Sequence, residues 1–190
     1  MLTLLKSLVI PTMEYCCPLW SQTDQFNIKS LEQIQRTFTK RIAGLQNVHY
    51  WDRLKQLRIF SLERRRDRYT IIYIWKVIHN FFPNPGFNIQ SIDRNDGIML
   101  TLPQNQAPAT IRKLKERSIL YYGVRLFRSL PSHLRKLQCT NDNKPPSTDS
   151  YKRSLDNYLH TLPDEPYCSK RQRRSPTNNI IDQKVYKDQL

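Results

Sequence analysis

The chain has 190 residues, with 31 Lys and Arg against 16 Asp and Glu, which gives a formal net charge of +15. Hydrophobic residues make up 38% of the sequence, which is enough for a core over part of the chain. No glycine-rich phosphate-binding motif occurs, which argues against the common nucleotide-binding folds. No apolar run approaches the ~18–20 residues that a membrane span requires, so we expect no membrane partner.

The first 80 residues are predicted to form a small helical bundle that begins with two short elements. Residues 2–10 form a helix that Pro11 should stop, because proline disfavours helical backbone in the residue before it. The apolar segment 12–20 is either a second short helix or a packed turn.

The periodicity of residues 25–43 predicts a longer helix with two distinct faces. Asp24 can cap its start and Gly44 can end it. The apolar face consists of Ile28, Leu31, Ile34, Phe38, Ile42 and Leu45. A row with the same period consists of Lys29, Gln33, Arg36 and Lys40. This row is either a binding face for a polyanion or an ordinary solvated face.

Two further helices are predicted over 50–57 and 62–80, the second with Ser61 as its N-cap. The first turns of the second helix carry Arg64, Arg65, Arg66 and Arg68. Its second half, 71–78, is apolar on nearly every side, which is typical of a helix buried between others. We therefore expect this helix at the centre of the bundle, with its basic first half projecting to the edge.

The composition changes after residue 80. Prolines and glycines in 81–110 predict an irregular connector with one short β-like run at 98–102. A C-terminal helical segment, 111–162, is divided into a strand or loop at 111–117, a helix at 119–129, a linker at 139–149 and a helix at 150–162. Residues 163–190 are expected to be a disordered basic tail. The predicted fold class is therefore mainly α.

The excess of basic residues lies in two blocks. Residues 1–80 and 111–138 each carry a net charge of +7, whereas 81–110 carries −1. Clustered positive charge is what a polyanion-binding surface requires, because each neutralised phosphate releases counterions. The alternative is that the charge serves solubility alone. Because the excess falls within periodic segments, contact with nucleic acid is the favoured interpretation.

The carboxylates and cysteines of this sequence lack the spacing that is typical of catalytic or metal-binding sites. A polymerase or nuclease needs paired carboxylates that hold metal ions, and the close pair Asp93 and Asp96 lies in a predicted loop without a third partner. Cys16 and Cys17 are adjacent rather than spaced for zinc. We therefore predict no catalytic residue, no metal ligand, no cofactor and no small-molecule substrate.

Cysteine usage and one basic run bear on location. The four scattered cysteines favour a reducing, intracellular compartment. The run KRQRR at 170–174 is similar to a short nuclear-import signal, so the expected location is nuclear or cytoplasmic. Trp20, Trp51, Trp75 and the pair Tyr121 and Tyr122 are candidates for stacking on bases, with core packing as the alternative.

Several separated motifs resemble one known family. The segment LKSLVIPTMEYCCPLW at 5–20 is similar to reverse transcriptases of non-LTR retrotransposons, the Jockey-like LINE group, just after their catalytic palm. Further similar segments follow in the family's order at 31–36, 54–66, 127–131 and 150–159. The resemblance covers about residues 1–162.

The resemblance implies a helical thumb over roughly 1–80, followed by a variable connector and a C-terminal segment. In the family, the thumb grips the template–primer duplex through its backbone. The implied partners are the backbone of an RNA/DNA duplex and the palm and fingers of the same polyprotein. Together with the basic blocks, this makes the candidate nucleic-acid-binding residues Lys29, Arg36, Lys40, Arg41, Arg64, Arg65, Arg66, Arg68, Arg112, Lys113, Lys115 and Arg117.

The family's catalytic Tyr/Phe-x-Asp-Asp motif, palm, fingers and endonuclease have no counterpart in this sequence. We therefore expect the chain alone to be inactive as an RNA-directed DNA polymerase, and the Mg²⁺ that the family enzyme uses to have no site in it. The expected function is that of a thumb and connector fragment that binds template–primer through basic helices. The alternatives are a contribution to catalysis within a longer polyprotein, a protein-interaction module whose apolar surface at 71–78 is uncovered, or a non-functional remnant.

Overall fold

The computed structural model describes residues 2–16, 25–91, 97–103, 108, 111–112, 115–116, 118–136, 147–165, 180–181 and 184. Over these residues the chain is mainly helical and carries one antiparallel pair of strands, β1 (Asn88–Ser91) and β2 (Ile98–Thr101). The predicted fold class is confirmed.

The chain stays helical through Pro11, so the prediction that this proline stops the first helix was wrong. Short helices α1 (Leu2–Leu4) and α2 (Ile10–Glu14) are joined by the π-helical stretch η1 (Leu5–Val9). The Ile10 N–H bonds to the Leu5 carbonyl across a wide π turn, and Pro11 then occupies the first turn of α2. A missing N–H is tolerated at that position, which explains why the helix continues.

Helix α4 (Gln25–Lys40) buries a face that differs from the predicted one. The predicted apolar residue Ile34 is 46% exposed, while Glu32, Gln35 and Thr39 are buried. The helix ends at Lys40, before Gly44, which adopts a φ of +82° in the turns that follow. The proposed cap, Asp24, lies outside the described residues.

Helices α5 (Tyr50–Leu57) and α6 (Leu62–Ile78) confirm the next two predictions. The Ser61 side chain accepts a hydrogen bond from the Arg64 backbone N–H, as expected for an N-cap. The second half of α6 is buried, also as expected. Its first half is buried too, because Arg64 is 0% and Arg66 3% exposed, so the predicted projection of this basic half to the edge was wrong.

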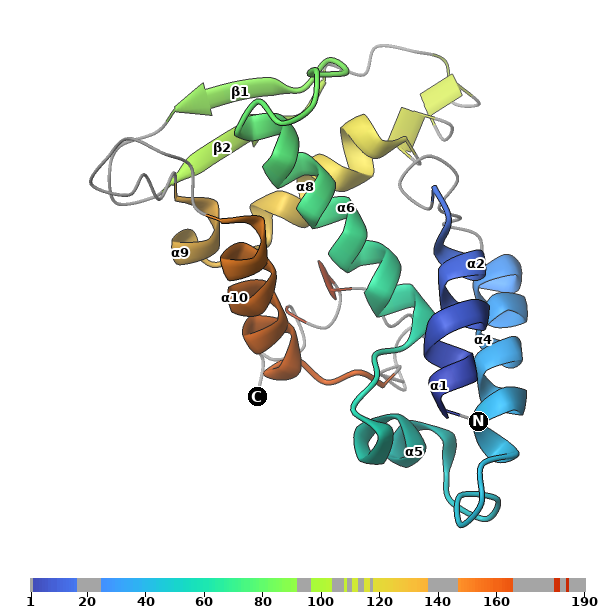
Figure 1. Cartoon of the computed structure of the whole chain (residues 1–190). Coiled ribbons are helices and arrows are strands. Elements are labelled where there is room, and N and C mark those ends of the chain that lie inside the picture. Colours follow the sequence, from blue (N-terminus) through green and yellow to red (C-terminus); the bar gives the residue numbers. More distant parts are fainter. Residues whose placement is uncertain are drawn as a thin grey trace.

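The described residues form two apolar clusters, and the larger one includes much of α6. The larger cluster covers its second half and includes residues of β2, of α8 (Val124–Arg128), of α9 (Ser132–Arg135) and of α10 (Thr148–His160). The smaller cluster joins Leu5, Ile10, Tyr50, Leu54 and Ile59. In Figure 1, the β1–β2 pair lies at the end of α6, and α1, α2 and α4 lie beside its beginning.

The strand predicted at 98–102 is confirmed by β2, whereas β1 was not predicted. Asn88 pairs with Thr101 and Ile89 with Leu100. The sequence of β1, NIQS, has one apolar residue and no alternation of apolar and polar residues, so it carries no strand signal of its own. It is a strand because it pairs with β2.

The C-terminal part contains the two predicted helices. The π-helical stretch η2 (Ile119–Gly123) and α8 fill the helix predicted at 119–129, and α10 starts two residues before its predicted position. Residues 111–112 and 115–116 are helical, so the strand or loop predicted there was wrong. Most of the predicted linker and tail lies outside the described residues, but Asp164 and Ile180 both contact α6.

Candidate nucleic-acid interface

One face of α4 carries exposed basic side chains. Lys29, Arg36 and Lys40 recur at helical spacing and share this face; the two lysines are exposed and Arg36 is half-buried. Arg41 is exposed just beyond the end of the helix. At 1.5 Å per residue, Lys29 and Lys40 lie about 16 Å apart along the helix axis, a span that several phosphates of a duplex backbone can match.

Aromatic residues of α5 hold Arg36 in place. Its guanidinium lies 4.4 Å from the ring centre of Tyr50 and 5.8 Å from that of Trp51. The Arg36 carbonyl also accepts a hydrogen bond from Arg53 Nη2 at 3.1 Å. Trp51, a candidate for base stacking, is therefore half-buried against α4, and its more immediate role is to support the basic face.

The only carboxylate of α4, Glu32, lies one helical turn from Lys29 and Arg36 but is buried. Glu32 is buried, accepts a hydrogen bond from the Tyr50 hydroxyl, and accepts another from the Leu62 N–H at 3.0 Å. Burial raises the pKa of Glu32 to about 7, although these hydrogen bonds act against the shift. The basic face of α4 thus has no solvent-exposed carboxylate from its own helix to compete with a phosphate.

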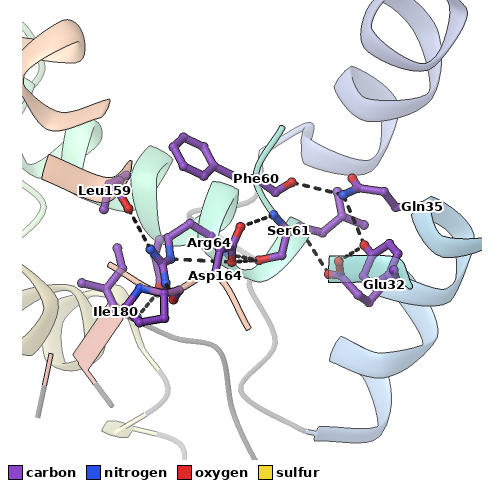
Figure 2. Close-up of polar contacts among 12 residues, drawn as sticks. Glu32, Gln35, Phe60, Ser61, Arg64, Leu159, Asp164 and Ile180 are labelled. Carbon is purple, nitrogen blue, oxygen red and sulfur yellow. Dashed lines mark hydrogen bonds and ion pairs between the residues drawn. The ribbon is translucent and has the colours of Figure 1, made fainter. Parts of the chain in front are cut away.

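Arg64, by contrast, is an internal structural residue. Its guanidinium donates to the Leu159 carbonyl at 3.2 Å and to the Pro163 carbonyl at 2.6 Å, and its Nε lies 3.9 Å from Asp164. Figure 2 shows Arg64 of α6 beside Leu159 at the end of α10 and Asp164 in the segment that follows it. Because Arg64 is fully buried, it has no route to a phosphate in this structure.

The other three α6 arginines are either paired with a carboxylate or buried. Arg65 pairs with Glu14, and Arg68 Nη2 lies 2.8 Å from Asp156. Arg66 is buried, and both its Nη atoms lack a hydrogen-bond partner among the described residues. Its neighbour Asp67 is buried as well, which raises the pKa of that carboxyl to about 6 despite hydrogen bonds from Tyr122 and Ile180.

The structure therefore separates the candidate residues into distinct groups. Lys29, Arg36 and Lys40 share one face of α4, and Arg41 is exposed directly after the helix. The arginines of α6 are buried or paired with carboxylates. Arg112 and Lys115 are exposed elsewhere in the chain, and Lys113 and Arg117 lie outside the described residues. Arg125 and Arg128, which are exposed three residues apart on α8, were not among the candidates chosen from the sequence. The net charge of +7 in residues 111–138 was the feature that could have indicated them.

Base-stacking candidates from the sequence have mainly packing roles. Trp75 is buried and stacks on Tyr151 with ring centres 4.5 Å apart. Tyr121 and Tyr122 are half-buried, and Trp20 lies outside the described residues.

Where residues are described, no three His, Cys, Asp or Glu side chains gather as they would around a metal ion. No helix in these ranges combines the length and apolarity needed to cross a membrane.

The chemistry available to the α4 face is the binding of anions. Lys and Arg side chains are hydrogen-bond donors with a permanent positive charge, so they neutralise and orient an anionic backbone. Comparisons with protein-family models, curated proteins and solved structures found no match to this chain. The basic face of α4 and the sequence resemblance are therefore the two features of this chain that bear on its function.

Proposed function

We propose that the chain binds the sugar–phosphate backbone of a nucleic-acid duplex without sequence preference, as the thumb and connector fragment of a retrotransposon reverse transcriptase. The observation that carries this proposal is the face of α4 with exposed Lys29 and Lys40 beside the anchored Arg36, followed directly by the exposed Arg41, while Glu32 is buried. The resemblance favours an RNA/DNA template–primer as the duplex. Polymerisation belongs to the palm and fingers of the same polyprotein, and the location is nuclear or cytoplasmic.

The salt dependence of binding follows from the number of cations on this face. Four residues that each neutralise one phosphate predict a slope of log K against log salt between about −3 and −4, because each contact contributes about −0.9. Contacts of this kind act on the backbone alone, so affinity should not depend on base sequence.

The test is binding of a blunt RNA–DNA duplex between 50 and 250 mM salt (approximately the range over which such contacts are measured). The variant K29A/K40A/R41A should make the slope about two to three units shallower and weaken binding equally for unrelated sequences. Arg36 is left intact because its removal would also disturb packing on Tyr50. Undetectable or salt-independent binding by the wild-type chain contradicts the proposal.

A matched control removes the same charge from other places. In K55A/K152A/R153A, Lys55 lies 3.7 Å from Asp52 and Lys152 lies 3.0 Å from Asp149, so these lysines already have carboxylate partners. This variant should keep a slope close to that of the wild type. Equal losses in the two triple variants would mean that binding follows net charge and not the α4 face.

One observation favours the alternative of a protein-interaction module. Leu4 and Leu8, four residues apart at the N-terminal end, are both exposed. The apolar segment 71–78, by contrast, is covered by the larger cluster. If this alternative holds, the wild-type chain should associate in sedimentation experiments, and L4E/L8E should abolish association while duplex binding persists.

A further inference from the structure

Two phenylalanines follow the end of α6 and are unusually exposed. Phe81 is 48% and Phe82 43% exposed, although such rings are normally buried. They come directly after Asn80, whose φ of +60° ends the helix in a left-handed turn. The Asn80 N–H bonds to the Val77 carbonyl at 3.1 Å and the Phe81 N–H to the Lys76 carbonyl at 2.9 Å, which is the pattern of a Schellman motif.

The loop after the two rings is anchored at its other end. Asn84 Oδ1 accepts hydrogen bonds from the Gly86 N–H at 3.0 Å and the Phe87 N–H at 2.7 Å. The Phe87 side chain is buried in the larger cluster. Phe81 and Phe82 are thus exposed on backbone that is fixed on both sides.

Each exposed ring rests on an aromatic residue of α6. Phe81 stacks on Trp75 with ring centres 5.8 Å apart and planes inclined by 22°. Phe82 stacks on Tyr73 at 6.0 Å and 25°, and Lys76 Nζ lies 5.2 Å from the centre of the Phe82 ring. The rings are therefore held in a defined orientation and still offer surface to solvent.

The size of this surface decides between kinds of occupant. With about 200 Å² per ring, two half-exposed phenylalanines offer roughly 200 Å². A stable protein interface needs about 800 Å² from each partner, whereas one or two stacked bases need no more than two rings.

The charge around the rings also fits an anionic strand. The sequence has no Asp or Glu from residue 68 to 91, and Lys76 lies at the Phe82 ring. Lys76 interacts electrostatically with Asp149, whose carboxylate oxygen lies 3.0 Å from Lys152 Nζ.

We propose that Phe81 and Phe82 stack on unpaired bases of a single-stranded nucleic acid. The inference rests on the proposed function in placing that strand beside a duplex held by α4. Helix α6 has 17 residues and so spans about 25 Å, which corresponds to roughly seven base pairs at 3.4 Å each. The chain would then bind a duplex and the unpaired strand that continues from it.

The test compares a blunt RNA–DNA duplex with the same duplex carrying a six-nucleotide overhang that contains 2-aminopurine. The wild-type chain should bind the overhang substrate at least tenfold more tightly and quench the 2-aminopurine fluorescence, because base stacking on an aromatic ring is strong and independent of sequence. The variant F81L/F82L keeps the apolar character but loses the flat rings, and should lose both effects. The variant F81W/F82W should retain both.

The outcomes separate this inference from the proposed function. If the blunt duplex binds but the overhang adds nothing, or if F81L/F82L behaves as the wild type, stacking is wrong and duplex binding stands. If no variant binds the blunt duplex but the wild type still quenches a single-stranded 2-aminopurine oligonucleotide and F81L/F82L does not, stacking stands and duplex binding is wrong. Thermal melts of both double variants confirm that the comparison is made between folded chains.

Discussion

Gly97 occupies a position at which no other residue fits well. Its φ is +77°, and a Cβ placed on it would lie 2.9 Å from the backbone carbonyl carbon of Arg135. The obstacle is backbone and cannot rotate away, unlike a flexible side chain. This close approach brings the start of β2 against the end of α9, and Arg135 itself is anchored by a hydrogen bond from its Nε to the Leu130 carbonyl at 2.9 Å.

We predict that G97A lowers the free energy of unfolding by about 2–4 kcal/mol, because left-handed strain and a backbone clash act together. Gly44 is a matched control, since its φ is +82° but a methyl group there would meet nothing within 4 Å. G44A should cost only about 1 kcal/mol. Urea denaturation of the two variants measures the difference, and equal midpoints would contradict the role given to Arg135.

Ser61 shows how one side chain joins two elements. It caps α6 by accepting from the Arg64 N–H at 3.2 Å, and its hydroxyl donates to Asp164 at 2.7 Å. The Ser61 N–H also donates to the same carboxylate at 2.7 Å. The start of α6 is therefore tied to the segment that follows α10 (Figure 2).

The variant S61A should destabilise the protein by about 2 kcal/mol, since it removes a cap and also a hydrogen bond to the partly buried Asp164. Ser147 offers a comparison because it caps α10 through one exposed contact with the Asp149 N–H at 3.4 Å. S147A should cost about 0.5–1 kcal/mol. Thermal melts that rank the two variants in the opposite order would show that the contact with Asp164 adds no stability.

Elements were easier to predict from the sequence than their faces. Local signals were sufficient for α5 and α6, because apolar periodicity and the Ser61 cap lie within the segments themselves. The environment of Arg64 was not predictable in this way, since its acceptors Leu159 and Pro163 come 95 and 99 residues later. A row of arginines at the start of a helix has the same local pattern whether it faces solvent or distant carbonyl groups.

The candidate site was predicted only in part for the same reason. The spacing of Lys29, Arg36 and Lys40 was enough to place them on one face of α4. Nothing in that spacing indicated that Glu32 would be buried, because its partners Tyr50 and Leu62 lie on other helices.

At the scale of the whole molecule, polar residues connect the two apolar clusters. Glu32 and Gln35 bond to Tyr50 of the smaller cluster, and Gln35 also donates to the carbonyl of Phe60, which packs against the larger one (Figure 2). Arg64 and Asp67 bond to Leu159 and Ile180 of the larger cluster. Buried carboxyl groups in such a position make stability depend on pH. The pKa of Glu32 rises from 4.5 to about 7 and that of Asp67 from 3.8 to about 6, both mainly through burial.

The sign of this dependence is opposite to that of a salt-bridged acid. An acid whose pKa is higher in the folded state holds its proton more tightly there, so its favourable contribution is complete below pH 4.5 for Glu32 and is lost as the pH rises to about 7. The free energy of unfolding of the wild type relative to E32Q should therefore fall by up to about 3 kcal/mol across this range. Urea midpoints measured from pH 4.5 to 8 test this, and parallel profiles for the two chains would contradict it.

The hydrogen bond from Ile180 to Asp67 joins residues 113 positions apart, which matters while the chain is being synthesised. At about 5–20 residues per second, roughly 6–23 seconds separate the appearance of Asp67 from that of its partner. Early in this interval α1, α2, α4 and α5 can already assemble, but the α8 and α10 residues that cover the apolar half of α6 have not yet been made. The nascent chain therefore presents an apolar helix to solvent for seconds, and chaperones that bind such segments on the ribosome should recognise it there.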